Sequence, residues 1–129
     1  MIGSQSMTAS EIHPTIVGPG REPAPIDLIH LARQTFGSAE LEREVLRLFV
    51  LQGATIARQI GAAPSVEERA AFAHRVKGSA RAIGAMRVGR IAEALETAAP
   101  GDVAGIAAEL GQAIGEVERF VAGLLAPAA

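Results

Sequence analysis

Residues 73–85, with the sequence AHRVKGSARAIGA, hold the pattern that decides the fold and the site of this chain. An α-helix turns once in about 3.6 residues, so positions three and four apart lie on the same side. Lys77 and Gly78 therefore flank His74. The opposite side carries larger apolar residues, namely Phe72, Val76 and Ile83. The stretch predicts a helix with one face for packing and one open face centred on the histidine.

The open face carries small side chains beside the charged ones. Its members are Ala70, Ala71, His74, Lys77, Gly78 and Arg81. No bulky residue shields the imidazole, so a second protein can approach it closely. Gly78 is less favourable than alanine in a helix interior by up to about 1 kcal/mol. This loss is understandable if the missing side chain leaves room for an incoming group, although a tolerated helix defect is the alternative.

The charge around His74 is positive. From Arg69 to Arg90 the sequence has six basic residues and no acid, and Lys77 is the only lysine in the chain. A compact ammonium one turn from an imidazole can neutralise an anion carried on that ring. A phosphoryl group adds roughly two negative charges. The basic run predicts a site for such an anion, and a merely solvated basic face is the alternative.

The run His74-x-x-Lys77-Gly78-Ser79-Ala80-x-x-Ile83-Gly84-Ala85 resembles the signature of histidine-containing phosphotransfer (HPt) domains. Such domains carry phosphoryl groups between aspartates of receiver domains in multistep phosphorelays. The resemblance implies that His74 accepts the phosphoryl group, that Lys77 steadies it and that Gly78 permits access. It also implies a side chain from the next helix that hydrogen-bonds the imidazole. Glu96 matches that position by spacing, where some members have glutamine.

The resemblance further implies the partners of the chain, which are response-regulator receiver domains and a hybrid or sensor histidine kinase. Partner contacts are expected at Ala70, Ala71, Arg75 and Arg81. No nucleotide-binding motif is visible, so we expect a phosphohistidine carrier and not an enzyme. Three histidines without any cysteine form no usual metal-ligand spacing. We therefore expect no cofactor, with Mg²⁺ supplied by the receiver domain.

The composition is that of one small helical domain. The 129 residues are 49% hydrophobic but only 3% aromatic, which favours a single core of close-packed helices. Runs without Asp, Glu, Lys or Arg reach about ten residues, short of the roughly 20 that span a membrane. The N-terminus lacks a signal-peptide pattern, and a net charge of −2 gives no drive toward nucleic acid. We expect a cytoplasmic monomer that binds neither membrane nor nucleic acid.

Helical periodicity predicts an all-α fold, an antiparallel four-helix bundle with a short additional N-terminal helix. Residues 1–24 are predicted to form a flexible lead, and residues 25–126 the bundle domain. The expected helices cover residues 27–36, 39–60, 65–84, 86–98 and 102–125. Their predicted caps are Ser38, Ser65 and Asp102 at the starts, and Gly37 and Gly84 at the ends.

Apolar stripes predict the buried side of the two longest helices. The stripe of the helix at 39–60 comprises Leu41, Val45, Leu48, Phe49, Gln52, Ile56 and Ile60. The last helix is expected to bury Val103, Ile106, Ala107, Leu110, Ile114, Val117, Val121 and Leu124. Its Gly111-x-x-x-Gly115 spacing predicts close contact with a neighbouring helix. His13 is expected to be exposed and without a role. His30, in the first short helix, is expected at the surface and outside the site.

Two other functions fit the pattern in part. The dimerisation module of a sensor histidine kinase is also helical and carries a phosphohistidine, but its histidine is typically followed by an acid and a later proline. Here Arg75 follows the histidine, and no proline lies between His74 and Pro100. A helical adaptor without chemistry, in which His74 is only a surface residue, is the second alternative.

Overall fold

The computed structural model of the chain describes residues 24–63 and 65–127, and the described part is all-α without any β-strand. Its elements are α1 (Leu28–Gln34), α2 (Ala39–Ala62), α3 (Val66–Ile83), α4 (Met86–Glu96), the 3₁₀ turn η1 (Pro100–Asp102) and α5 (Val103–Leu125). The predicted fold class is confirmed. Most of the predicted lead, residues 1–23 with His13, lies outside the described residues. None of the described helices combines the length and hydrophobicity needed to span a bilayer.

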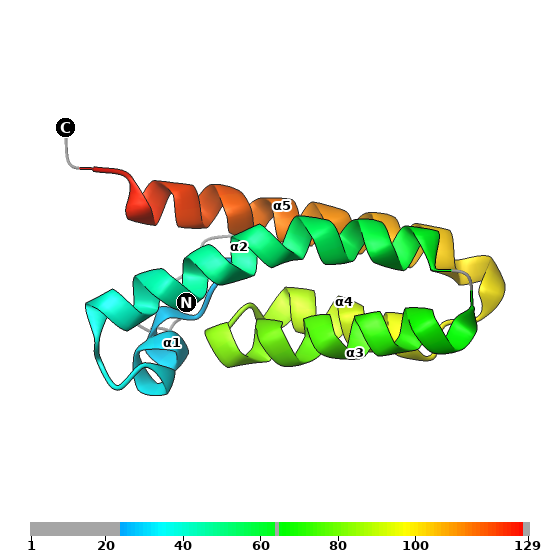
Figure 1. Ribbon diagram of the computed structural model, residues 1–129, viewed down its shortest axis with the longest axis horizontal. Helices are drawn as coiled ribbons and strands as arrows, with labels where there is room; N and C mark the ends of the chain where they lie inside the picture. Colours follow the sequence, from blue (N-terminus) through cyan, green and yellow to red (C-terminus); the bar gives the residue numbers. More distant parts are fainter. Residues whose placement is uncertain (1–23, 64, 128–129) are drawn as a thin grey trace, which may run out of the picture.

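The four long helices form two layers (Figure 1). α2 and α5 lie side by side in one layer, while α3 and α4 form the other, and consecutive helices run in opposite directions. The short α1 sits at the end of the bundle where α2 begins and α3 ends, and it packs on α3. The predicted antiparallel four-helix bundle with an additional N-terminal helix is therefore confirmed.

Local capping explains most helix boundaries. The Ser38 hydroxyl accepts a hydrogen bond from the Leu41 amide at 3.1 Å, and the Ser65 hydroxyl accepts one from the Glu68 amide at 3.1 Å. Each side chain satisfies one of the unpaired amides of a first helical turn. Gly84 ends α3 in the left-handed conformation, with φ of 86°. The predicted caps at these three positions are confirmed.

The end of α4 and the start of α5 differ from the prediction. α4 stops at Glu96, two residues earlier than expected, and η1 leads directly into α5. Asp102 already has helical backbone angles and its side chain makes no capping hydrogen bond, so the predicted cap is wrong. A 3₁₀ turn that runs into an α-helix leaves no extended residue from which a side chain can reach back to the amides.

The core lies between the two layers and is lined mostly by aliphatic residues. The fully buried large side chains are Ile26, Leu31, Ile60, Leu95, Leu110, Val88 and Val117. Four residues of the predicted stripes are exposed instead, namely Leu41 (41%), Leu48 (46%), Leu124 (44%) and Gln52. On α2 the buried side is rotated toward Leu46, Phe49 and Gly53, because α2 must face α3 and α5 together. Leu124 lies in the last turn of α5, near the end of the bundle.

A glycine of α2 makes the close helix contact that was expected from α5. A Cβ atom built on Gly53 would lie 3.2 Å from a methyl carbon of Ile114, so α2 and α5 approach tightly there. Gly111 is exposed with nothing within 4 Å of its Cβ position, and Gly115 meets only the Arg119 guanidinium at 3.5 Å. The predicted contact through Gly111 and Gly115 is wrong, because no other described helix comes within 4 Å of either Cβ position.

Hydrogen bonds join α1 and the residue before it to the end of α3. The Asp27 amide donates to the Gly84 carbonyl at 2.9 Å, and His30 Nε2 donates to the Arg81 carbonyl at 2.8 Å. Both acceptors belong to the last turn of α3 and its cap, where carbonyls lack helical partners. His30 thus holds α1 on α3, a structural contact that the sequence did not predict.

Replacing Gly84 should destabilise the bundle at this junction. In Gly84→Ala the new Cβ would lie 2.7 Å from the Asp27 carbonyl oxygen and 3.2 Å from its amide nitrogen. The left-handed backbone adds about 1–2 kcal/mol for a residue with a Cβ. We expect the free energy of unfolding, measured by urea denaturation, to fall by at least that amount.

Gly111→Ala is the matched control, because its Cβ would enter open space on a regular helix. This variant should be as stable as the unaltered chain or up to about 1 kcal/mol more stable. Equal stability of Gly84→Ala and the unaltered chain would contradict the strain assigned to this cap.

Candidate functional site

His74 lies in the middle of α3 and points away from the core. Its side chain is 70% exposed, although Ala73 and Val76 beside it are buried. Gly78, one turn further along, is exposed and has nothing within 4 Å of its Cβ position. The imidazole is therefore held at a fixed place on a rigid helix and remains open to a large partner.

Small residues at the interface let α4 pack closely on α3 beside this face. Ala73, Ala80 and Ala92 have no exposed surface, and Gly89 of α4 lies against α3. A Cβ on Gly89 would lie 3.2 Å from Arg81 Cγ and 3.9 Å from the Ala80 methyl. Charged side chains at the rim can therefore reach from one helix to the other.

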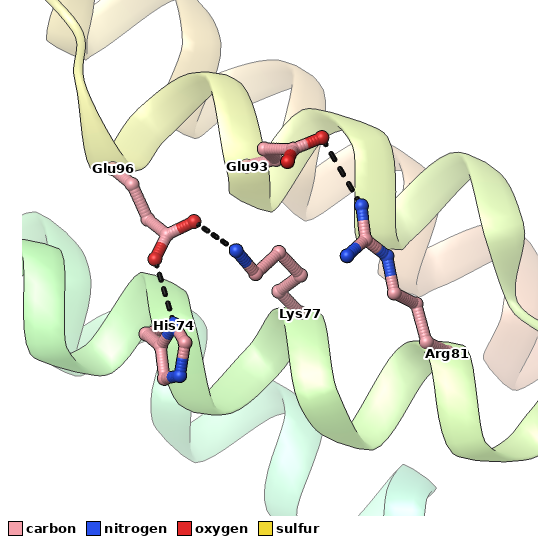
Figure 2. A network of polar contacts seen from close by, with 5 residues as sticks. All are labelled: His74, Lys77, Arg81, Glu93 and Glu96. Carbon is pink, nitrogen blue, oxygen red and sulfur yellow. Dashed lines mark hydrogen bonds and ion pairs between the residues drawn. The ribbon is translucent and has the colours of Figure 1, made fainter.

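Glu96, the last residue of α4, connects two residues of α3 (Figure 2). Its Oε2 lies 2.8 Å from His74 Nδ1, and its Oε1 accepts a hydrogen bond from Lys77 Nζ at 2.6 Å. The carboxylate and the ammonium are both mostly covered, with 19% and 17% of their side chains exposed. The structure thus joins three of the residues that sequence reasoning selected.

This arrangement distinguishes the two imidazole nitrogens. A carboxylate can only accept hydrogen bonds, so Nδ1 carries a proton and donates it in the hydrogen bond to Glu96. In a neutral ring the other nitrogen, Nε2, then keeps its lone pair. Figure 2 shows Nε2 on the side of the ring that faces away from Glu96. The available nucleophile of this site is therefore Nε2.

The same contacts lower the pKa of Glu96 below its ordinary value. The hydrogen bond from Lys77 is the largest cause, and the hydrogen bond with His74 follows. Partial burial works in the opposite direction, but the two donors outweigh it. Glu96 therefore remains a charged acceptor over a wide pH range.

The basic face is partly neutralised by acids of α4. Arg81 Nη2 donates to Glu93 Oε1 at 3.1 Å, and both side chains are about half exposed. Glu93 and Glu96 are three residues apart, so they lie on the same side of α4 and face α3. This spacing is the signal that could have found Glu93, which sequence reasoning did not assign to the site. Arg81 is exposed, as the sequence predicted, but its stem also lies against Gly89 of α4 and its guanidinium binds Glu93.

The remaining predicted contact residues, Ala70, Ala71 and Arg75, lie close to His74 along α3. Ala71 is exposed and Ala70 is half-buried on the same face of α3. Arg75 is exposed, and its guanidinium carbon lies 4.6 Å from the centre of the Phe72 ring, which is a cation–π distance. These residues leave a low surface around the imidazole.

Within 24–63 and 65–127, no three His, Cys, Asp or Glu side chains gather as they would around a metal ion.

Comparison with protein families identifies the bundle. The family model of the Hpt domain matches residues 44–122, which is more than half of the chain. The chain belongs to the Hpt domain family. A search of curated proteins and a search of solved structures each gave no match. The matched range covers α3, α4 and nearly all of α2 and α5, and leaves α1 outside.

Membership of the Hpt domain family has a direct functional consequence. Hpt domains are phosphotransfer carriers in phosphorelays and generally interact with receiver domains and kinases. The chain therefore has a phosphotransfer role of this kind. The family match also separates it from the dimerisation modules of sensor kinases, which the sequence left open.

The lowered pKa of Glu96 predicts how the contacts depend on pH. An acid with a lowered pKa in the folded state stabilises the protein above its unfolded pKa, which is roughly 4.3 for glutamate. This contribution is lost as the pH falls further, through the folded value. Compared with Glu96→Gln, the unaltered Hpt domain should therefore lose stability more steeply below about pH 4.3.

Carboxyl-carbon NMR titration of Glu96 measures the pKa directly. We expect a pKa below the ordinary value for glutamate, roughly 4.3. A pKa at or above that ordinary value would contradict the contacts assigned to Glu96.

Proposed function

We propose that this Hpt domain accepts a phosphoryl group on His74 Nε2 from a receiver aspartate or a kinase, and passes it to the aspartate of a response-regulator receiver. The observation that carries the proposal is the asymmetry of the imidazole. Nδ1 faces Glu96 at 2.8 Å, while the exposed ring presents Nε2 to solvent. A neutral imidazole nitrogen with a free lone pair is a nucleophile near pH 7.

The transfer step needs no further group from this chain. The Nε2 lone pair forms a bond to phosphorus while the bond from phosphorus to the aspartyl oxygen breaks, and the aspartate leaves as a carboxylate. The ring then carries a positive charge with its proton still on Nδ1, where Glu96 stabilises that charge. In the onward step a receiver carboxylate attacks phosphorus and Nε2 leaves with its electron pair, which restores the neutral ring.

We further propose that the receiver domain supplies Mg²⁺ and the acceptor carboxylate. Phosphoryl transfer requires charge neutralisation around the moving group. A receiver must enclose this group, so it needs a low surface around the histidine. The face with Ala70, Ala71, Gly78 and Arg75 meets this need, with Arg81 at its edge beside Glu93.

Removal of His74 tests the proposal. With a phosphorylated receiver domain as donor, the unaltered Hpt domain should become labelled, and His74→Gln should not. Because His74 is an exposed residue of a regular helix, the circular dichroism of the variant should match that of the unaltered chain. His30→Gln is the matched control and should keep its label. Equal labelling of His74→Gln would refute the proposal, and a chain that is never labelled would support an adaptor without chemistry.

Replacing Gly78 with a larger residue should limit the access of a receiver to Nε2 of His74. Gly78→Val adds a branched side chain one turn from His74, at a position with open space in the free domain. Folding should therefore be retained, while transfer from the receiver should slow by about tenfold or more, the scale of a misplaced reacting group.

Gly111→Val makes the same change on an exposed part of α5, away from the site, and should leave transfer unaltered. If both variants transfer at the unaltered rate, Gly78 is only a tolerated defect of the helix.

A further inference from the structure

The side of α2 that faces away from the bundle carries exposed leucines. With its opposite side α2 packs on α3 and α5 (Figure 1), and there Leu46, Gly53 and Ile60 are buried. Leu48 and Leu51 lie on the outward side and are 46% and 73% exposed. Single exposed leucines are common on protein surfaces, but several leucines on one face of a helix mark a surface that binds a partner.

The outward residues of α2 follow a heptad pattern. They alternate at spacings of three and four residues, and all of them are exposed, namely Leu41, Glu44, Leu48, Leu51, Thr55 and Arg58. This spacing is that of the a and d positions of a coiled coil, where two helices pack side by side. The buried Leu46, Gly53 and Ile60 occupy the f positions, which lie opposite such a contact. The six outward residues are called the α2 seam below.

The charged ends of the α2 seam have no ionic partner in the described part of the chain. The four ion pairs within residues 24–63 and 65–127 include neither Glu44 nor Arg58. The Arg58 guanidinium donates to a neutral group, the Thr55 hydroxyl of its own helix, at 3.4 Å. The seam is therefore acidic toward the start of α2, apolar in the middle and basic toward the end.

We propose that the α2 seam binds a second copy of this chain, which packs against it in the antiparallel direction. A two-fold axis between Leu48 and Leu51 brings each Leu48 against Leu51 of the other copy. The same axis sets Glu44 opposite Thr55 of the other copy and within one helical turn of its Arg58. The proposal goes beyond phosphotransfer and departs from the monomer that was expected from the sequence.

The charges favour the antiparallel direction over the parallel one. In a parallel pair each residue of the seam faces its own equivalent, so Glu44 would lie against Glu44 and Arg58 against Arg58. Like charges across an interface disfavour association, and opposite charges favour it. In the antiparallel pair each end of the contact combines one acid with one base. Removal of the central leucines from water supplies the apolar part of the contact.

A receiver domain is the other candidate for this surface. Leu51 shares a groove between α2 and α3 with Arg75 and Ser79, and Arg75 is a predicted receiver contact. The match of acid and base within the seam favours a second copy, because a receiver has no need to repeat this pattern. Association of the free chain separates the two occupants, since it is measured without any receiver.

Sedimentation of the full chain measures the association directly. We expect the average mass to rise from that of a monomer to that of a dimer as the protein concentration increases to the millimolar range. Leu51→Glu should raise the dissociation constant of the dimer by about tenfold or more, because it places a charge at the centre of the contact. Ile29→Glu is the matched control and should leave this constant unchanged, since Ile29 is 68% exposed on α1, outside the seam. Both variants should keep the circular dichroism of the unaltered chain, because neither side chain is buried.

Cysteine cross-linking tests the direction of the pair. The chain has no cysteine, so an introduced thiol is the only one present. A mixture of Glu44→Cys and Thr55→Cys should form a disulfide between the two copies. Either variant alone should not, because its two thiols would lie about 16 Å apart along the helices, beyond the Cα separation of roughly 7 Å that a disulfide allows.

A chain that remains monomeric up to millimolar concentration would overturn the proposal. If Leu51→Glu then slows transfer from a phosphorylated receiver, the seam is a receiver contact instead. A dimer that Leu51→Glu leaves intact would show that the contact lies elsewhere on the chain. A disulfide in Glu44→Cys alone would show a parallel pair, and either result contradicts the proposed arrangement.

Discussion

The close packing of α3 on α4 is the constraint on which the site depends. Alanines with no exposed surface and one glycine of α4 form the contact, so the two backbones come near each other. Apolar burial of this kind favours the bundle in proportion to the surface removed from water. Its consequence for chemistry lies at the rim, where Glu93 and Glu96 reach Arg81, Lys77 and His74. Larger residues at the interface would move the two helices apart and thereby break these polar contacts.

At the site, the backbone of His74 is fixed in the bundle while its imidazole is open to solvent. The backbone of α3 is anchored by Ala73 and Val76 in the core, while the imidazole between them is 70% exposed. Glu96 restrains the ring from one side only, and the other nitrogen is left to the partner. A carrier that passes a group between proteins needs both properties, because the acceptor atom must be positioned before the partner arrives and reachable when it does.

Two glycines, one inside α3 and one that ends it, differ in what the fold requires of them. Gly84 is required by the fold, because its left-handed backbone ends α3 and its carbonyl accepts the Asp27 amide. Gly78 is not required by the fold, since a Cβ there would meet nothing within 4 Å. A glycine in a helix interior lowers stability, and nothing in the free domain compensates for this at Gly78. Under the proposed function, the approach of a receiver to His74 gives the glycine a role.

Much of this protein was determined by its sequence alone. The five helices, the caps at Ser38, Ser65 and Gly84, the all-α class and the site around His74 all follow from local patterns. Such patterns act over one or two turns, so the sequence displays them directly.

Only the tertiary structure decided which distant residues meet. Glu93 faces Arg81, His30 binds the last turn of α3, and Lys77 lies on Glu96 instead of standing free beside the histidine. The exposure of Leu41, Leu48 and Leu124 belongs to the same class. Each depends on the rotation of one helix about its axis relative to its neighbours, and small changes in that rotation exchange one apolar or charged neighbour for the next. The spacing of residues within a single helix does not contain this information, because the packing of all the helices together determines it.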